Sequence, residues 1–78
     1  PIHILIIPKK AMRDVSCVED EDAEIVGELF LAARDLVQKL GIKGGYRLVV
    51  NNGPQAGQAV FHLHMHLLAG RDFTWPPG

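Results

Sequence analysis

Cysteine is nearly absent from this sequence, which has Cys17 as its single cysteine among 78 residues. One thiol cannot form an internal disulfide, so the chain lacks the covalent framework of many small secreted domains, and we expect a reducing, cytoplasmic location. We expect Cys17 to be a free, buried thiol. A chain of this length forms at most one small domain with a thin core, which favours stabilisation by oligomerisation.

Long apolar runs and an excess of charge of either sign are also absent. The longest unbroken apolar run, residues 4–7, is far too short to cross a bilayer, and no signal-peptide pattern precedes it, so we expect no membrane association. Acidic and basic residues nearly cancel at a formal net charge of -1, and the longest basic run is Lys9 and Lys10. This balance argues against binding of a nucleic-acid polymer and leaves a nucleotide monomer open as a ligand.

The first half of the chain predicts one strand followed by one helix. Residues 2–7 are rich in β-branched side chains and end at Pro8, which is typical of a short buried strand. An acidic run at 19–22 precedes an apolar stripe with helical spacing that ends at Gly41, so we expect a helix of about five turns. Phe30 and the leucines of this stripe are predicted to lie in the core.

The second half predicts two more strands. Residues 46–50 form an apolar run that ends in the turn sequence at 51–54, and residues 62–68 form another run after a short connection. Strands joined in this way are antiparallel. The expected fold class is therefore α+β, an antiparallel sheet with one main helix packed on it.

Within residues 62–68, histidines alternate with apolar side chains at His62, His64 and His66. Successive side chains of a strand point to opposite faces, so these rings share one face at a spacing of about 6.5 Å. Each imidazole titrates near neutral pH and is suited to act as nucleophile, acid or base. A row of titratable rings adds nothing to a core, so we interpret this face as a functional site.

Several polar or flexible residues stand near this row. His3 lies on one face of the first strand, and the strand pattern alone leaves a structural and a functional role equally open. Asn51 stands at the end of the second strand. Gly57 permits a tight backbone just before the histidines, so the N–H groups of Gly57, Gln58 and Ala59 are candidates for binding an anion.

Three kinds of chemistry are compared for the histidine row: metal binding, acid-base catalysis and nucleophilic attack. Three histidines on one straight strand cannot easily converge on the same zinc ion, and His3 is the only histidine outside the row. We therefore expect no metal. Nucleophilic attack on phosphorus by a neutral imidazole fits better. His64, in the middle, is the candidate nucleophile, and either His62 or His66 is the candidate hydrogen-bond donor to the phosphoryl oxygens or the leaving group.

The histidine row resembles the histidine triad superfamily, together with Asn51 before it and the Trp-Pro-Pro-Gly ending at 75–78 after it. More narrowly, the chain is similar to the Hint branch, the histidine triad nucleotide-binding proteins, over nearly its whole length. The resemblance implies one domain over residues 1–78 that lacks the N-terminal segment of the family. It also implies a homodimer with a sheet continued across the subunits, no cofactor, and hydrolysis of purine nucleoside phosphoramidates such as AMP joined to an amine.

The resemblance also implies separate roles for the histidines. His64 would form a covalent nucleotidyl intermediate, and His66 would bond the α-phosphate. The backbone carbonyl of His62 would fix the tautomer of His64. His3 matches a fourth histidine of the family, which supports proton transfer around the triad.

Outside the histidines, the resemblance implies that Asn51, Gly57 and Gln58 line the ribose-phosphate site. Trp75 matches a residue that reaches the active site of the partner subunit. Ala59 departs from the pattern, because many Hint proteins carry a serine there that contacts the phosphate and the leaving group. The backbone N–H at this position survives the substitution.

Two other functions stay open at this point. The same pocket would suit a non-catalytic module that binds a nucleotide or another protein. A sister branch of the superfamily cleaves dinucleoside polyphosphates, although the Trp-Pro-Pro-Gly ending argues for the Hint branch.

Overall fold

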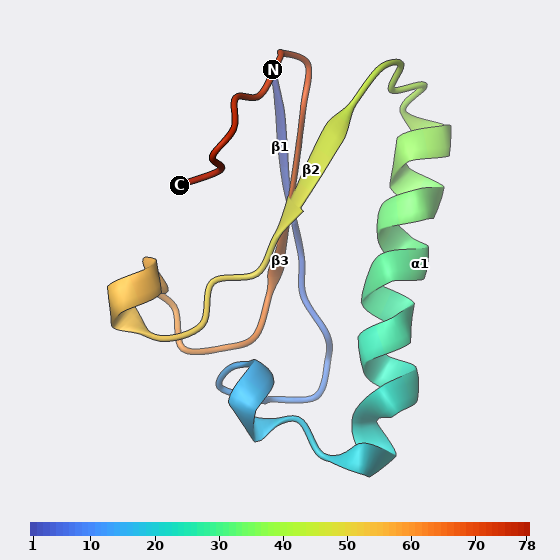
Figure 1. Ribbon diagram of the computed structural model, residues 1–78. Coiled ribbons are helices and arrows are strands. Elements are labelled where there is room, and N and C mark those ends of the chain that lie inside the picture. Colours follow the sequence, from blue (N-terminus) through green and yellow to red (C-terminus); the bar gives the residue numbers. More distant parts are fainter.

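The structure is a computed structural model that describes all of residues 1–78, and it has two layers, a sheet and one long helix (Figure 1). β3 lies between β1 and β2 and is antiparallel to both. The expected α+β fold, with one main helix on an antiparallel sheet, is confirmed. No helix has the length and apolarity needed to cross a lipid bilayer. The elements are β1 (Ile2–Ile6), α1 (Ala23–Lys39), β2 (Tyr46–Val49) and β3 (Met65–Ala69), with short 3₁₀ helices at Val15–Cys17, Asp20–Asp22 and Pro54–Ala56.

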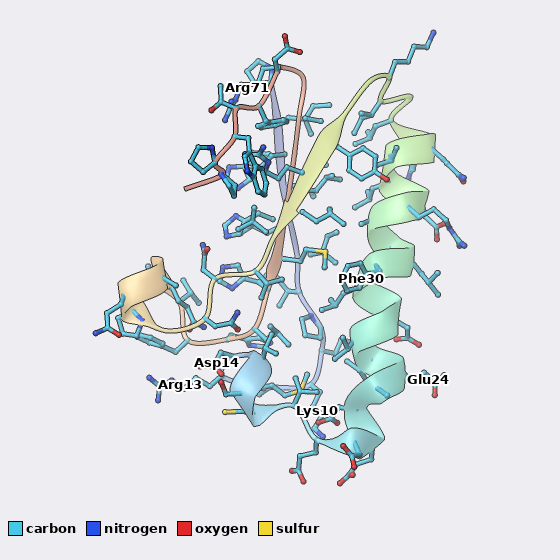
Figure 2. The ribbon with its side chains drawn as sticks, viewed as in Figure 1. Lys10, Arg13, Asp14, Glu24, Phe30 and Arg71 are labelled. Carbon is cyan, nitrogen blue, oxygen red and sulfur yellow. The ribbon has the colours of Figure 1, made fainter.

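Local signals set both ends of α1. The carboxylate of buried Asp22 accepts hydrogen bonds from Lys10 Nζ (2.5 Å) and from the Glu19 N–H (3.0 Å). These two bonds, that of Lys10 first, hold the pKa of Asp22 below its usual value, and Lys10 lies beside the start of the helix (Figure 2). Beyond the other end, Gly41 has a φ of +62°, a left-handed conformation that suits glycine. The acidic run and this glycine therefore predicted the helix correctly.

The third strand begins later than its sequence predicts, at Met65 rather than at residue 62. Its neighbour β1 ends at Ile6, which pairs with Met65, and Pro8 lies beyond it without an N–H to donate. The ladder therefore has no partner for the residues before Met65. The Leu63 N–H instead donates to the Met12 carbonyl at 2.6 Å.

The strand register separates an apolar face from a histidine face. On β3, Met65, Leu67 and Ala69 are buried on the side of α1. The alternate positions face away from α1, because side chains alternate along each strand. We call this second side the histidine face. Its strand residues are His3, Leu5, Arg47, Val49, His66 and Leu68.

Two predictions about the core are wrong. Phe30 is 54% exposed, and Leu40 at the end of the stripe is 49% exposed, because the part of α1 that contacts the sheet is the narrower line containing Leu29 and Ala33. Cys17 is a free but exposed thiol, because it ends a 3₁₀ helix that buries none of its residues. The core consists of Ile6, Met12, Leu29, Ala33, Leu63, Met65 and Leu67.

Candidate active site

A main-chain carbonyl fixes the protonation pattern of His64. His64 Nδ1 lies 2.6 Å from the carbonyl oxygen of His62. A carbonyl oxygen only accepts hydrogen bonds, so Nδ1 must carry the proton and donate it. The other nitrogen, Nε2, then has a free lone pair. His64 is thus held in the tautomer that a nucleophile requires.

The ring of His62 does not join those of His64 and His66 in the predicted row, because it bonds to the segment after β1. Its Nε2 donates to the carbonyl oxygen of Pro8 at 3.1 Å, in the segment that follows β1. His62 therefore contributes in two different ways. Its backbone carbonyl orients His64, and its ring ties the backbone before β3 to the end of β1.

His3, which comes from β1, lies directly beside His66 of β3. His3 pairs with Leu68 across the ladder and Leu5 pairs with His66, so His3 and His66 are diagonal neighbours on the histidine face. His3 Nε2 lies 2.7 Å from His66 Nδ1, so one ring donates a hydrogen bond to the other. The structure therefore places His3 in contact with the histidine cluster.

The resulting cluster is more compact than the predicted row. The ring centroids of His64 and His66 are 5.0 Å apart, and so are those of His3 and His66. Burial lowers the pKa of His66 first, and the nearby charges of His64 and His3 lower it further. Its imidazole is therefore neutral at neutral pH. The hydrogen bond between His3 and His66 gives a proton a short path between these two rings.

A small cavity of about 230 Å³ opens beside His64. His62 and His64 are its polar lining residues, and three aliphatic residues complete the lining. This arrangement suits a ligand with one apolar part and one part that reacts with an imidazole. The aliphatic lining was not predicted from the sequence, although alternation along the first strand places Leu5 and Ile7 on the side of His3. The lining residues are Leu5, Ile7, Val60, His62 and His64.

The predicted anion-binding loop keeps only one free N–H group. Gly57 has a φ of +91° and its N–H donates to the Pro54 carbonyl at 3.0 Å. The N–H of Gln58 donates to the Gly53 carbonyl at 3.1 Å. The N–H of exposed Ala59 has no hydrogen-bond partner in the chain. Of the three amides that the sequence singles out, the structure leaves that of Ala59 available.

Gln58 is buried, and its side chain forms hydrogen bonds that join two loops. The residue is 4% exposed, and its Oε1 accepts a hydrogen bond from the Gly53 N–H at 2.8 Å. Its Nε2 donates to the carbonyls of Arg13 (2.7 Å) and Val60 (3.1 Å), so both side-chain N–H groups are used internally. The side chain of Gln58 therefore holds the loops together, a role that was not predicted from the sequence, which pointed only to the phosphate site.

Asn51 and Trp75 occupy different surroundings. Asn51 lies two residues beyond Val49, the partner of His66, and its side chain makes no hydrogen bond within the chain. Trp75 is 82% exposed and lines a separate hollow beside β2 rather than the cavity of His64. No group of three or more His, Cys, Asp or Glu side chains is arranged to hold a metal ion.

Comparison with known proteins places this site in a family. A sequence model of the HIT domain matches residues 1–73. Over all 78 residues the chain is 50% identical to a HIT-like protein of Synechocystis sp., of which it spans 68%. It superimposes on the HIT family hydrolase from Legionella pneumophila with a TM-score of 0.94 at 47% identity, over 100% of this chain and 70% of that chain. A histidine triad protein from Clostridium difficile gives a TM-score of 0.89 at 33% identity, over 95% of this chain and 65% of that chain. The chain therefore belongs to the HIT domain family.

Proposed function

We propose that the protein is a hydrolase of the Hint branch that cleaves the P–N bond of purine nucleoside phosphoramidates through a nucleotidyl-His64 intermediate. The observation that carries this proposal is the bond from His64 Nδ1 to the His62 carbonyl, which leaves Nε2 as a free nucleophile. Similar solved structures from Legionella pneumophila and Clostridium thermocellum are HIT family hydrolases, which supports hydrolysis as the reaction class. The Hint-like ending at 75–78 supports the branch and the purine substrate.

In the first step, the lone pair of His64 Nε2 attacks the phosphorus atom. A bond forms between phosphorus and Nε2 while the bond between phosphorus and the amine nitrogen breaks. The amine leaves with the electron pair and takes up a proton from the protonated form of the hydrogen-bonded His66 and His3 pair. The lowered pKa of His66 makes its protonated form a stronger acid, which favours this transfer.

In the second step, water attacks the phosphorus atom of the intermediate. The bond to His64 Nε2 breaks, and the nitrogen recovers its lone pair. The proton from water returns to the His66 and His3 pair, so the products are the nucleoside monophosphate and the free amine. The unpartnered N–H of Ala59 is available to donate to a phosphoryl oxygen in both steps.

The proposal includes a homodimer with a continuous sheet. Both β1 and β2 are edge strands, so each has an outer edge without a ladder partner, which is a template for pairing with another chain. Large apolar side chains are also exposed, among them Ile7 (55%), Phe30 (54%) and Val60 (63%). A second copy would cover such surfaces.

Turnover of an adenosine phosphoramidate by the purified protein tests the function. We expect His64→Ala to lower kcat by about four orders of magnitude or more, because it removes the nucleophile. His62→Gln should lower it far less, because the backbone carbonyl that orients His64 remains. Rapid quenching followed by mass spectrometry of the protein should detect a nucleotide on His64 in the wild type.

Three outcomes would contradict the proposal. If His64→Ala turned the substrate over at the wild-type rate, His64 would not be the nucleophile. Binding of the nucleotide without turnover by the wild type would favour the non-catalytic module. Faster cleavage of a dinucleoside polyphosphate than of the phosphoramidate, compared side by side, would favour the sister branch.

A further inference from the structure

The peptide group between His62 and Leu63 is held at both of its ends. Its carbonyl oxygen accepts the bond from His64 Nδ1 at 2.6 Å, and its N–H donates to the Met12 carbonyl at 2.6 Å. A peptide group is planar and rigid, so a rotation that turns the N–H away from Met12 also turns the carbonyl away from His64. The Met12 carbonyl therefore sets the direction of the acceptor that holds the tautomer of His64.

The Met12 carbonyl belongs to the connection between β1 and α1, residues 8–15, which we call the connecting segment. This segment has no regular structure before the short 3₁₀ helix that begins at Val15. The bond from Leu63 to Met12 is the only backbone-to-backbone hydrogen bond of residues 8–13. The path of the connecting segment therefore depends on its contacts with the rest of the protein.

The connecting segment binds residues 52–63, the loop of the site, through its main chain. Three of its carbonyls and one of its N–H groups form hydrogen bonds to that loop, whereas its side chains form none. Its influence on the site therefore depends on where its backbone lies. The bonds join the Pro8 carbonyl to His62 Nε2 (3.1 Å), the Met12 carbonyl to the Leu63 N–H (2.6 Å), the Arg13 carbonyl to Gln58 Nε2 (2.7 Å) and the Val15 N–H to Asn52 Oδ1 (2.8 Å).

Two side chains anchor this backbone to the body of the protein. Met12 is 6% exposed and belongs to the core. Lys10 stands midway between Pro8 and Met12 in the sequence, and its Nζ lies 2.5 Å from the carboxylate of Asp22, beside the start of α1 (Figure 2). The side chain of Asp22 is 2% exposed, so it is the fixed member of this ion pair. The start of α1 thus holds the connecting segment between two of the carbonyls that bind the loop.

The ion pair keeps both of its charges where the histidines titrate. The hydrogen bond with Lys10 is the main cause that lowers the pKa of Asp22, and the same bond raises the pKa of Lys10. Asp22 is therefore an anion and Lys10 a cation at every pH at which an imidazole gains or loses a proton. Titration of the ion pair itself does not enter the pH dependence of the site near neutral pH.

We propose that the Lys10–Asp22 ion pair is a positioning device for the nucleophile. It fixes the connecting segment, the segment fixes the peptide group between His62 and Leu63, and that peptide group keeps the proton of His64 on Nδ1. Neither member of the pair forms a hydrogen bond with a histidine, so both act through the backbone. The inference rests on the proposed function, and it concerns the first step, in which the free lone pair of Nε2 attacks phosphorus.

Single-turnover kinetics with saturating adenosine phosphoramidate test the effect on that step. We expect Asp22→Asn and Lys10→Met each to slow the formation of nucleotidyl-His64 roughly tenfold to a hundredfold, because a small misplacement of a reacting group is costly. The substrate concentration at half-saturation should change little. Lys10→Arg, which keeps the charge, should recover most of the rate. Arg34→Met is the matched control, because it breaks the exposed ion pair of α1 with Asp35, and it should react at the wild-type rate.

A second control separates positioning from stability. Leu36 packs against the core from the last turns of α1, far along the helix from Asp22. Leu36→Ala should lower the urea midpoint of unfolding at least as much as Asp22→Asn does, because it leaves a cavity. It should nevertheless form nucleotidyl-His64 at the wild-type rate under conditions in which the chain is folded.

Nitrogen-15 NMR of the histidine rings measures the tautomer without any turnover. At pH 8 we expect the wild type to show a protonated Nδ1 and an unprotonated Nε2 for His64, whose signals are identified by their absence from His64→Ala. In Asp22→Asn and Lys10→Met, the Nε2 signal of His64 should move toward the protonated value. It should not move in Arg34→Met or Leu36→Ala.

The outcomes separate this inference from the proposed function. A wild-type rate or a wild-type tautomer in folded Asp22→Asn would overturn the inference, and Lys10→Met decides in the same way if Asp22→Asn does not fold. An equal loss of rate in Leu36→Ala would also overturn it, because lost stability would then be the cause. If the wild type formed no nucleotidyl intermediate, the proposed function would fail, and the tautomer alone would still decide whether the ion pair positions His64.

Discussion

At the scale of single residues, hydrogen bonds give the four histidines different tasks that their spacing does not reveal. Alternation places Leu63, Met65 and Leu67 on the face opposite to the histidines, and all three are buried. It did not predict that the ring of His62 turns to the Pro8 carbonyl, or that His3 bonds to His66. Both contacts join positions more than fifty residues apart, so they depend on strand register rather than on local pattern.

The depressed pKa of His66 predicts a loss of stability in acid. The unfolded chain binds a proton at this position near pH 6.5, whereas the folded chain does so only at lower pH. Below about pH 6.5 the unfolded state therefore binds more protons, and the free energy of unfolding falls as the pH falls toward the folded pKa. Urea unfolding at pH 7.5 and pH 5.5 should show a smaller pH dependence in His66→Gln than in the wild type. An equal dependence in both would show that His66 does not contribute.

At the scale of elements, the sequence predicts those elements whose signals are local. The start and end of α1 follow from the acidic run before it and from Gly41 after it. The first residue of β3 does not follow from its own sequence, because the neighbouring strand β1 ends at Ile6, the partner of Met65, shortly before Pro8. The central place of β3 in the sheet was likewise not predicted, since pairing with β1 joins the two ends of the chain.

The loop between β2 and β3 depends on Gln58 for its shape. Gln58→Ala removes three hydrogen bonds from a buried site and leaves their partners unpaired, so we expect a loss of about 2–4 kcal/mol in the free energy of unfolding. Gln55→Ala, at an exposed position of the same loop, is the control and should change it by less than about 0.5 kcal/mol. Chemical denaturation measures both. If Gln58→Ala weakened nucleotide binding without a loss of stability, Gln58 would act mainly in the ligand site.

At the scale of the whole molecule, the buried core is small for the surface that it must support. Only 11 of 78 residues are buried, whereas Phe30, Phe61 and Trp75 are each more than half exposed. A domain of this size buries a limited share of its surface, so a second copy is a direct source of further burial. The sequence predicted the small core from chain length alone, but it could not show which apolar side chains would remain outside.

The proposed homodimer predicts stability that depends on concentration. If folding and association are coupled, each tenfold increase in protein concentration should add about 1.4 kcal/mol to the apparent stability of the dimer. Sedimentation equilibrium should give twice the mass of the chain under the same conditions. A single mass equal to one chain, with an unfolding midpoint that does not change with concentration, would exclude the dimer.

The carbonyl that orients His64 has a consequence for how variation is inherited at this site. Every amino acid carries the same carbonyl group, so no codon change at position 62 can delete it. The backbone that carries this carbonyl is held by the His62 ring on the Pro8 carbonyl and by the Leu63 N–H on the Met12 carbonyl, and both of these acceptors are main-chain groups as well. A substitution at position 62 removes the ring but leaves all three carbonyls in place, so the inheritance of the His64 orientation is protected against most single amino-acid replacements in this segment.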